Sequence, residues 1–282
     1  MSGILSVVGT PIGNLDDLSP RAAATLQRAD IIACEDTRVT RKLLARLPER
    51  SRARLVSTHA RNEAARAGEL ARAAAGGKRV ALVTDAGMPG LSDPGHRVVS
   101  ACLDAGITVE VVPGPSAVTA AVIASGLPSA RFVFEGFLPR TGKALRTRLA
   151  GLEDERRTIV VFEAPHRLAK TLAALADALG GRRAAIVREL TKIHEEVVRG
   201  RLDELATTVA DAGVRGEITI VIEGAPQRAR AEPNPAALAD EVLSRVEAGE
   251  HKKEAIAAVA VARGVPKRRV YDAVVTRTTE SS

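Results

Sequence analysis

Short β-branched runs alternate with helical stretches up to Val112, and this alternation restricts the fold more than any other feature of the chain. The helical stretches include residues 20–29, where Ser19 followed by Pro20 is a typical helix start. The expected strands are Ile4–Val8, Ile31–Cys34, Leu55–Ser57, Val80–Val83 and Ile107–Val112. Strands that alternate with helices predict a mostly parallel sheet with helices on both faces, which is an α/β fold.

A second set of strands follows a helix rich in small residues, Ser116–Ser125. These strands lie closer together in the sequence than the first set, which indicates a mixed sheet. They are Phe132–Glu135, Thr158–Phe162, Ala185–Arg188, Glu196–Val198 and Ile218–Glu223, with helices at Leu168–Leu179 and Leu202–Asp211. We therefore expect two α/β domains, at residues 1–115 and 116–226.

The segment 224–235 contains several proline breaks and no periodicity, which is typical of a linker. Helical patterns follow at Ala236–Val246, Lys252–Arg263 and Lys267–Val275, the last two joined by a Gly-Val-Pro turn as in a helix-turn-helix. We expect a small helical domain at residues 234–282. Its basic residues around the turn are Lys252, Lys253, Arg263, Lys267, Arg268 and Arg269. They fit a phosphate-contacting face, although a dimerisation or purely structural role fits equally well.

The formal net charge of +7 favours a polyanionic partner. With only four Phe and one Tyr, the chain has too few rings to stack several unpaired bases, so RNA would be bound through phosphates and shape. The sequence has no apolar run of membrane length and does not begin like a signal peptide. Cys34 and Cys102 have no disulfide or metal spacing, which is typical of reduced core residues. We therefore expect a cytoplasmic protein.

Three loops rich in Gly and Pro follow predicted strands, at residues 9–14, 84–95 and 113–117. In an open α/β sheet, ligands bind beyond the carboxyl ends of the strands, and Asp85 at such an end could accept hydrogen bonds from a ribose or an amine. Each loop also has a plainer interpretation. The loop at 9–14 can be read as a structural turn. Within the loop at 84–95, Ser92-Asp93-Pro94 can be read as a helix start, and within the loop at 113–117, Ser116 can be read as a helix N-cap and nothing more.

Polar residues also end several strands, and most such charges in proteins form paired or solvated surface contacts. They lie at 35–38, 163–167, 188–195 and 216–217. No HxxxH or repeated His/Cys spacing supports a metal site, so no metal is expected.

Eight blocks in their order along the chain resemble the family of ribosomal RNA small-subunit methyltransferase I, the cytidine 2′-O-methyltransferases. The blocks are residues 8–15, 34–38, 84–95, 113–117, 135–140, 163–167, 188–192 and 216–217. The resemblance implies a tetrapyrrole-methylase-like fold, with S-adenosylmethionine in the cleft between the two α/β domains, and a homodimer. It implies cofactor contacts from Pro11, Ile12, Asp85, Met88, Ser116, Ala117, Phe162 and Leu190. Family members often carry Tyr at the position of Phe162.

The resemblance further implies methylation of a decoding-region cytidine within the assembled small ribosomal subunit. The RNA contacts expected are Arg38 and the basic residues near the helix-turn-helix, Lys252, Lys253, Lys267, Arg268 and Arg269. It does not identify the catalytic base.

Methyl transfer from a sulfonium needs in-line positioning but no metal. A ribose 2′-hydroxyl is a poor nucleophile, so a base or a cation that favours the alkoxide should help. The candidates are Glu35, Asp36 and the cluster of Lys192, His194 and Glu195. Two alternatives stay open: a methyltransferase of the same fold acting on a tetrapyrrole or a modified protein histidine (diphthine-type), and a nucleic-acid-binding regulator built on the helix-turn-helix.

Overall fold

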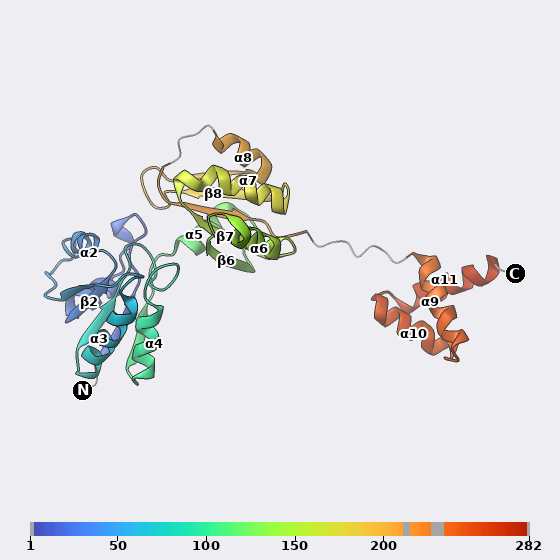
Figure 1. Ribbon diagram of the computed structural model, residues 1–282, viewed down its shortest axis with the longest axis horizontal. Helices are drawn as coiled ribbons and strands as arrows, with labels where there is room; N and C mark the ends of the chain where they lie inside the picture. Colours follow the sequence, from blue (N-terminus) through green and yellow to red (C-terminus); the bar gives the residue numbers. More distant parts are fainter. Residues whose placement is uncertain (1–2, 211–214, 227–233, 281–282) are drawn as a thin grey trace. The chain divides into compact units, whose positions relative to one another are not determined.

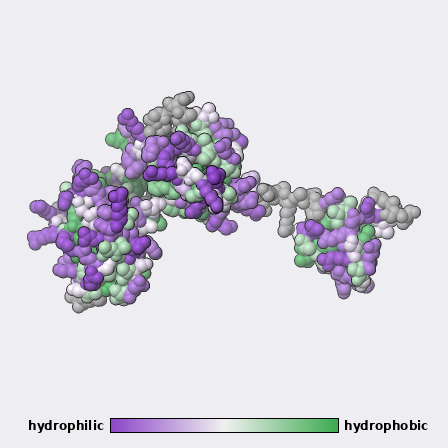
Figure 2. All heavy atoms as spheres, in the orientation of Figure 1, coloured by the Kyte–Doolittle hydropathy of each residue, from purple (hydrophilic) through white to green (hydrophobic). Residues whose placement is uncertain are grey.

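The computed structural model describes residues 3–210, 215–226 and 234–280. The chain divides into two compact units, a first unit that ends at Ala225 and a second unit that begins at Pro226 (Figure 1). Figure 2 shows hydrophilic side chains spread over the visible face of both units. No helix among the described residues is both long enough and apolar enough to cross a membrane.

The first sheet of the first unit is entirely parallel, with strand order β3-β2-β4-β1-β5. Its strands are β1 (Ile4–Val8), β2 (Ile31–Cys34), β3 (Arg54–Ser57), β4 (Arg79–Leu82) and β5 (Thr108–Val112). The helices between them are α1 (Pro20–Arg28), α2 (Thr37–Leu44), α3 (Glu63–Ala75) and α4 (His96–Asp104). α1 and α2 pack on one face, while α3 and α4 pack side by side on the other (Figure 1). The parallel α/β arrangement predicted from the alternation is confirmed.

The connections after β1 and β4 leave this sheet in opposite directions. β1 leads through α1 to β2, which lies beyond β4, whereas β4 leads through α4 to β5, which lies beyond β1. In open α/β sheets ligands bind at such a reversal, outside the carboxyl ends of the strands. The fold therefore puts the loops at 9–14 and 83–95 where a ligand is expected.

The second sheet of the first unit has the order β6-β7-β10-β8-β9 and is mixed, as predicted. Its strands are β6 (Phe132–Phe137), β7 (Thr158–Glu163), β8 (Arg183–Arg188), β9 (Glu196–Arg201) and β10 (Ile218–Ile222). α5 (Ala117–Ser125) packs on one face through Val118, Ala121 and Val122. The other face carries α6 (Gly142–Leu152), α7 (Leu168–Leu179) and α8 (Leu202–Ala210). α6 was not predicted from the sequence. Asp211, the predicted end of the helix that begins at Leu202, lies outside the described residues.

The second unit contains three helices around a small core of its own. They are α9 (Pro235–Glu247), α10 (Lys252–Arg263) and α11 (Lys267–Glu280). Gly264 ends α10 with a φ of 64°, a left-handed conformation that glycine adopts without strain. Pro235 is the first residue of α9, so the predicted linker is too long at that end; residues 227–233 lie outside the described part of the chain.

Candidate functional site

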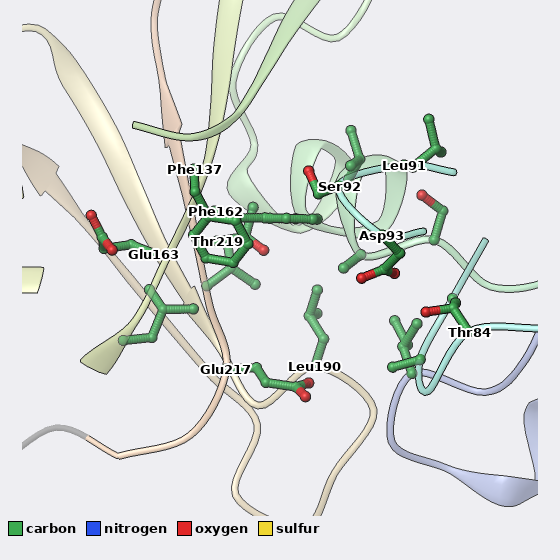
Figure 3. Close-up of a pocket in the computed structure, with 18 of the residues that line it drawn as sticks. Thr84, Leu91, Ser92, Asp93, Phe137, Phe162, Glu163, Leu190, Glu217 and Thr219 are labelled. Carbon is green, nitrogen blue, oxygen red and sulfur yellow. The ribbon is translucent and has the colours of Figure 1, made fainter. Parts of the chain in front are cut away.

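A cavity of about 400 Å³ opens at the reversal of the first sheet, and we call it the switch-point cavity (Figure 3). Seven of the eight residues predicted to contact the cofactor line it: Ile12, Asp85, Met88, Ser116, Ala117, Phe162 and Leu190. They come from loops and strand ends in both halves of the first unit. The structure thus brings these seven together, while their contact with a cofactor stays a prediction.

Pro11 does not line this cavity. It lines a neighbouring cavity of about 480 Å³ beside α2, which we call the α2 cavity. Thr84 and Asp85 line both cavities and form part of the wall between them. Although Pro11 and Ile12 are adjacent in the sequence, they therefore serve different cavities.

The turn after β1 is held close to two other loops. Thr10 exchanges backbone hydrogen bonds with Gly87 at 2.9 and 3.2 Å. A Cβ atom on Gly9 would lie 2.6 Å from the backbone nitrogen of Gly114, so a side chain there would collide with the next loop. The turn is thus both a structural turn and one side of a cavity.

The plainer interpretations of the other two loops fail. α4 begins at His96 after Gly95, and Ser92 lies in a left-handed turn with a φ of 66°, so Ser92-Asp93-Pro94 does not start a helix. Ser116 occupies the N-cap position of α5, but its side chain makes no capping hydrogen bond. Both serines instead line the switch-point cavity.

The loop after β8 presents Leu190 to the cavity through unusual backbone geometry. Glu189 and Thr191 on either side have positive φ angles of 51° and 66°, a conformation that costs free energy in residues with side chains. Contacts with the other half of the unit hold the loop in place, because the backbone nitrogen of Asn14 donates to Thr191 Oγ1 at 3.0 Å. A Cβ atom on Gly13 would lie 2.5 Å from Lys192 Cγ, so the two loops meet closely at that glycine.

Carboxylates crowd one side of the switch-point cavity, where Figure 3 shows Asp93 beside Thr84. Burial raises the pKa of Asp93, and the negative charges of Asp85 and Glu217 add to the rise. Burial also raises the pKa of Asp85, although its side chain accepts a hydrogen bond from the Asp36 backbone at 3.1 Å. A ligand with a positive charge would relieve this repulsion.

The cavity also has a wall of aromatic rings from the second sheet. Phe162 packs edge to face against Phe134 and Phe137, with ring centroids 4.9 and 5.8 Å apart. Phe137 and Phe162 both line the cavity. The site therefore joins an apolar wall to an anionic one.

The two acidic candidates after β2 differ in character. Asp36 caps α2, since its carboxylate accepts from the Arg38 backbone at 2.7 Å, and it pairs with the Arg38 guanidinium at 2.6 Å. These bonds lower the pKa of Asp36 to about 2, which makes it a weak base. Burial and the nearby charges of Asp93 and Asp85 raise the pKa of Glu35. Neither carboxylate lines either cavity.

Lys192 links two strand ends, because its ammonium group contacts Glu189 at 2.8 Å and Glu217 at 3.1 Å. Burial lowers its pKa, but these hydrogen bonds outweigh that effect and leave the pKa raised. Glu195 accepts from the Thr191 backbone at 2.7 Å and so braces the same loop, while His194 is exposed. Among the described residues, no group of three or more His, Cys, Asp or Glu lies together as a metal would require.

The candidate RNA contacts fall in both units. Arg38 is 83% exposed beside its Asp36 partner in the first unit. Lys252, Lys253, Lys267 and Arg268 are exposed on α10 and α11, while Arg269 is half-buried.

Asp93, Glu217 and Phe137 also line the switch-point cavity, although none of them was predicted to be a site residue. All three lie within the blocks that carry the family resemblance, at 84–95, 216–217 and 135–140. Their positions near the ends of strands or loops were the sequence signal that could have predicted a place in the site.

Known proteins resemble this chain over most of its length. The family model described as Tetrapyrrole (Corrin/Porphyrin) Methylases matches residues 5–206. A Mycobacterium tuberculosis protein, "Ribosomal RNA small subunit methyltransferase I", is 52% identical over 97% of this chain and 95% of its own. The Thermotoga maritima protein of the same name is 47% identical over 79% of this chain and 99% of its own.

Among solved structures, a Thermus thermophilus uroporphyrin-III C-methyl transferase complexed with S-adenyl homocysteine aligns with a TM-score of 0.53. It is 23% identical and covers 78% of this chain and 96% of its own. At that identity the likeness bears on the fold alone.

Proposed function

Because the chain belongs to the ribosomal RNA small subunit methyltransferase I family, within the tetrapyrrole methylases, we propose that it methylates the 2′-hydroxyl of a cytidine in small-subunit ribosomal RNA. S-adenosylmethionine is the methyl donor of this family. The observation that carries the proposal is the switch-point cavity, where residues from seven of the eight ordered family blocks converge on one site at the sheet reversal. We keep the decoding region of the assembled subunit as the proposed location of the target, and the cytoplasm as the proposed compartment.

The residues of the switch-point cavity fit the cofactor. Its volume suits a small organic ligand. Asp85 and Asp93, whose raised pKa values reflect burial first, can hold the positive sulfonium and amino groups or the ribose hydroxyls. The edge-to-face rings of Phe137 and Phe162 offer an apolar surface, and Ala117 leaves room at the start of α5.

S-adenosylmethionine supplies, when bound, an electrophilic methyl group whose transfer to the ribose oxygen leaves a neutral thioether and releases one proton. The released proton needs an acceptor, and the developing alkoxide benefits from a nearby cation. Lys192 is the cation that we favour: it lines neither cavity, but its ammonium group contacts Glu217, which lines the switch-point cavity, and its raised pKa keeps it protonated. Glu35 is the better base of the two acidic candidates.

We propose that the second unit adds RNA affinity and that catalysis belongs to the first. The Thermotoga protein carries the same name, yet it matches 79% of this chain over nearly all of its own length. The unmatched part of this chain is about as long as the second unit. We also retain the homodimer and the domain boundaries after residues 115 and 226 as proposals.

Methylation of small ribosomal subunits from a strain that lacks this protein tests the function. With labelled S-adenosylmethionine and mass spectrometry of the nucleosides, we expect one 2′-O-methylated cytidine. Lys192→Met should lower turnover about a hundredfold, with cofactor affinity nearly unchanged, and Lys192→Arg should restore part of it. Cofactor binding without methylation would favour a small-substrate methylase, and failure to bind the cofactor would contradict both enzyme functions.

Asp93→Asn is expected to stabilise the free protein and to weaken cofactor binding about tenfold. A carboxyl group whose pKa is higher in the folded than in the unfolded state destabilises the fold once it is ionised, so its penalty is present at neutral pH and disappears in acid. The gain in melting temperature should therefore shrink as the pH falls through the raised pKa. Calorimetric titration and thermal melts from neutral to acidic pH measure both effects; equal affinity in the two proteins would exclude an ionic contact from Asp93.

A further inference from the structure

The α2 cavity has a definite chemical character. Pro11 and Leu15 line it from the turn after β1, and Val39 and Leu43 line it from α2. Leu15 is 44% exposed and Val39 is 38% exposed, so apolar surface faces solvent at this opening. Large apolar side chains left exposed together at a cavity indicate a ligand that covers them.

Two cations stand at the same cavity. Lys42 lies in the last turn of α2 and Arg46 lies two residues beyond the end of that helix, and both line the cavity together with Val39 and Leu43. Both are exposed, and neither forms an ion pair within the described part of the chain. Cations without a protein partner beside an apolar surface suit an anionic ligand that has a flat apolar part.

The wall shared with the switch-point cavity is polar. The Thr84 side chain is buried, with 3% of the residue exposed, and its hydroxyl lies beside Asp93 but makes no hydrogen bond of normal geometry among the described residues. Asp85 lies beside it on the same wall and lines both cavities. A buried hydroxyl without a hydrogen bond of normal geometry is costly, so this wall favours a ligand group that can bond to it.

We propose that the α2 cavity holds the acceptor nucleotide, turned out of the RNA strand. Its base lies against Pro11, Leu15 and Val39, its phosphates contact Lys42 and Arg46, and its ribose faces the wall of Thr84 and Asp85. This inference rests on the proposed function, since Thr84 and Asp85 line both cavities and the acceptor ribose must reach the methyl group of the donor directly at that border. It explains why an RNA enzyme with so few aromatic residues can hold an unstacked base, because aliphatic side chains cover its face.

Two variants of the full chain test this assignment. Val39→Trp fills the cavity from a partly exposed position on α2 and should lower kcat/KM for small ribosomal subunits at least about a hundredfold. Replacing Lys42 and Arg46 together by Ala should raise KM for the subunits about tenfold, with kcat little changed. In both variants the Kd for S-adenosylmethionine, measured by calorimetry, should stay within about twofold of the wild-type value.

Replacing Arg50 and Arg52 together by Ala is the matched control, because it removes the same charge from exposed positions outside the cavity. This control should leave KM nearly unchanged. If the wild-type protein methylates subunits and both cavity variants match it, the acceptor assignment is wrong while the proposed function stands. If the wild-type protein binds cofactor but methylates no subunit, the proposed function fails, and the acceptor assignment fails with it.

Discussion

Ala117→Leu is expected to abolish cofactor binding and leave the fold intact. Ala117 is the first residue of α5, and it lines the switch-point cavity instead of the core. A leucine there would occupy space that the ligand needs, and neither Ile12 nor Phe162 can retreat from packed surroundings without cost. We expect the Kd for S-adenosylmethionine to rise at least about a hundredfold, with the melting temperature of the free protein little changed.

Thr119→Leu provides the matched control for this variant. Thr119 lies on the same helix and is exposed outside the cavity, so it accepts the same side chain without meeting the ligand. Its cofactor affinity should equal that of the wild-type protein. Tight binding by Ala117→Leu would show that the cofactor lies elsewhere, and the assignment of the switch-point cavity would have to be abandoned.

The strands could be predicted because the residue types within each segment are enough to indicate a buried strand. Runs such as Ile31–Cys34 and Ile218–Ile222 are β-branched or apolar over their whole length, as strands buried on both faces must be. α6 could not be predicted in the same way. Its arginines and glycines interrupt the apolar pattern, and only Leu149 and Leu152 are buried.

The candidate site was predictable only in part, since the sequence supplies its loops but not their partners. Pro11 and Ile12 were expected to act together, but Pro11 lines the α2 cavity and Ile12 lines the switch-point cavity. The mutual repulsion of Asp93 and Glu217 joins residues far apart in the chain, so no local pattern could reveal it. Ordered blocks indicate the family, whereas the roles proposed for individual side chains depend on the geometry of the site.

Removal of residues 226–282 is expected to leave cofactor binding intact and to raise KM for small ribosomal subunits about a hundredfold. The second unit has its own core, which includes Leu238, Val259 and Val270, so its loss does not expose the core of the first unit. Its contribution would be electrostatic, through the lysines and arginines around the turn between α10 and α11. The truncated protein should therefore also show a weaker dependence of KM on salt concentration.

Charge reversal separates this electrostatic role from a structural one. Replacing exposed Lys267 and Arg268 by Glu should reproduce most of the rise in KM, because neither side chain is buried in the helical core. Replacing exposed Arg28 and Arg52 by Glu makes the same change of charge in the first unit, away from both cavities, and should have little effect on KM.

If truncation raises KM while charge reversal at residues 267 and 268 does not, the second unit acts through shape or dimerisation, and its basic face is not the RNA contact. If truncation lowers kcat at saturating subunit concentration, residues 226–282 take part in the catalytic arrangement, and the division of roles between the two units is wrong.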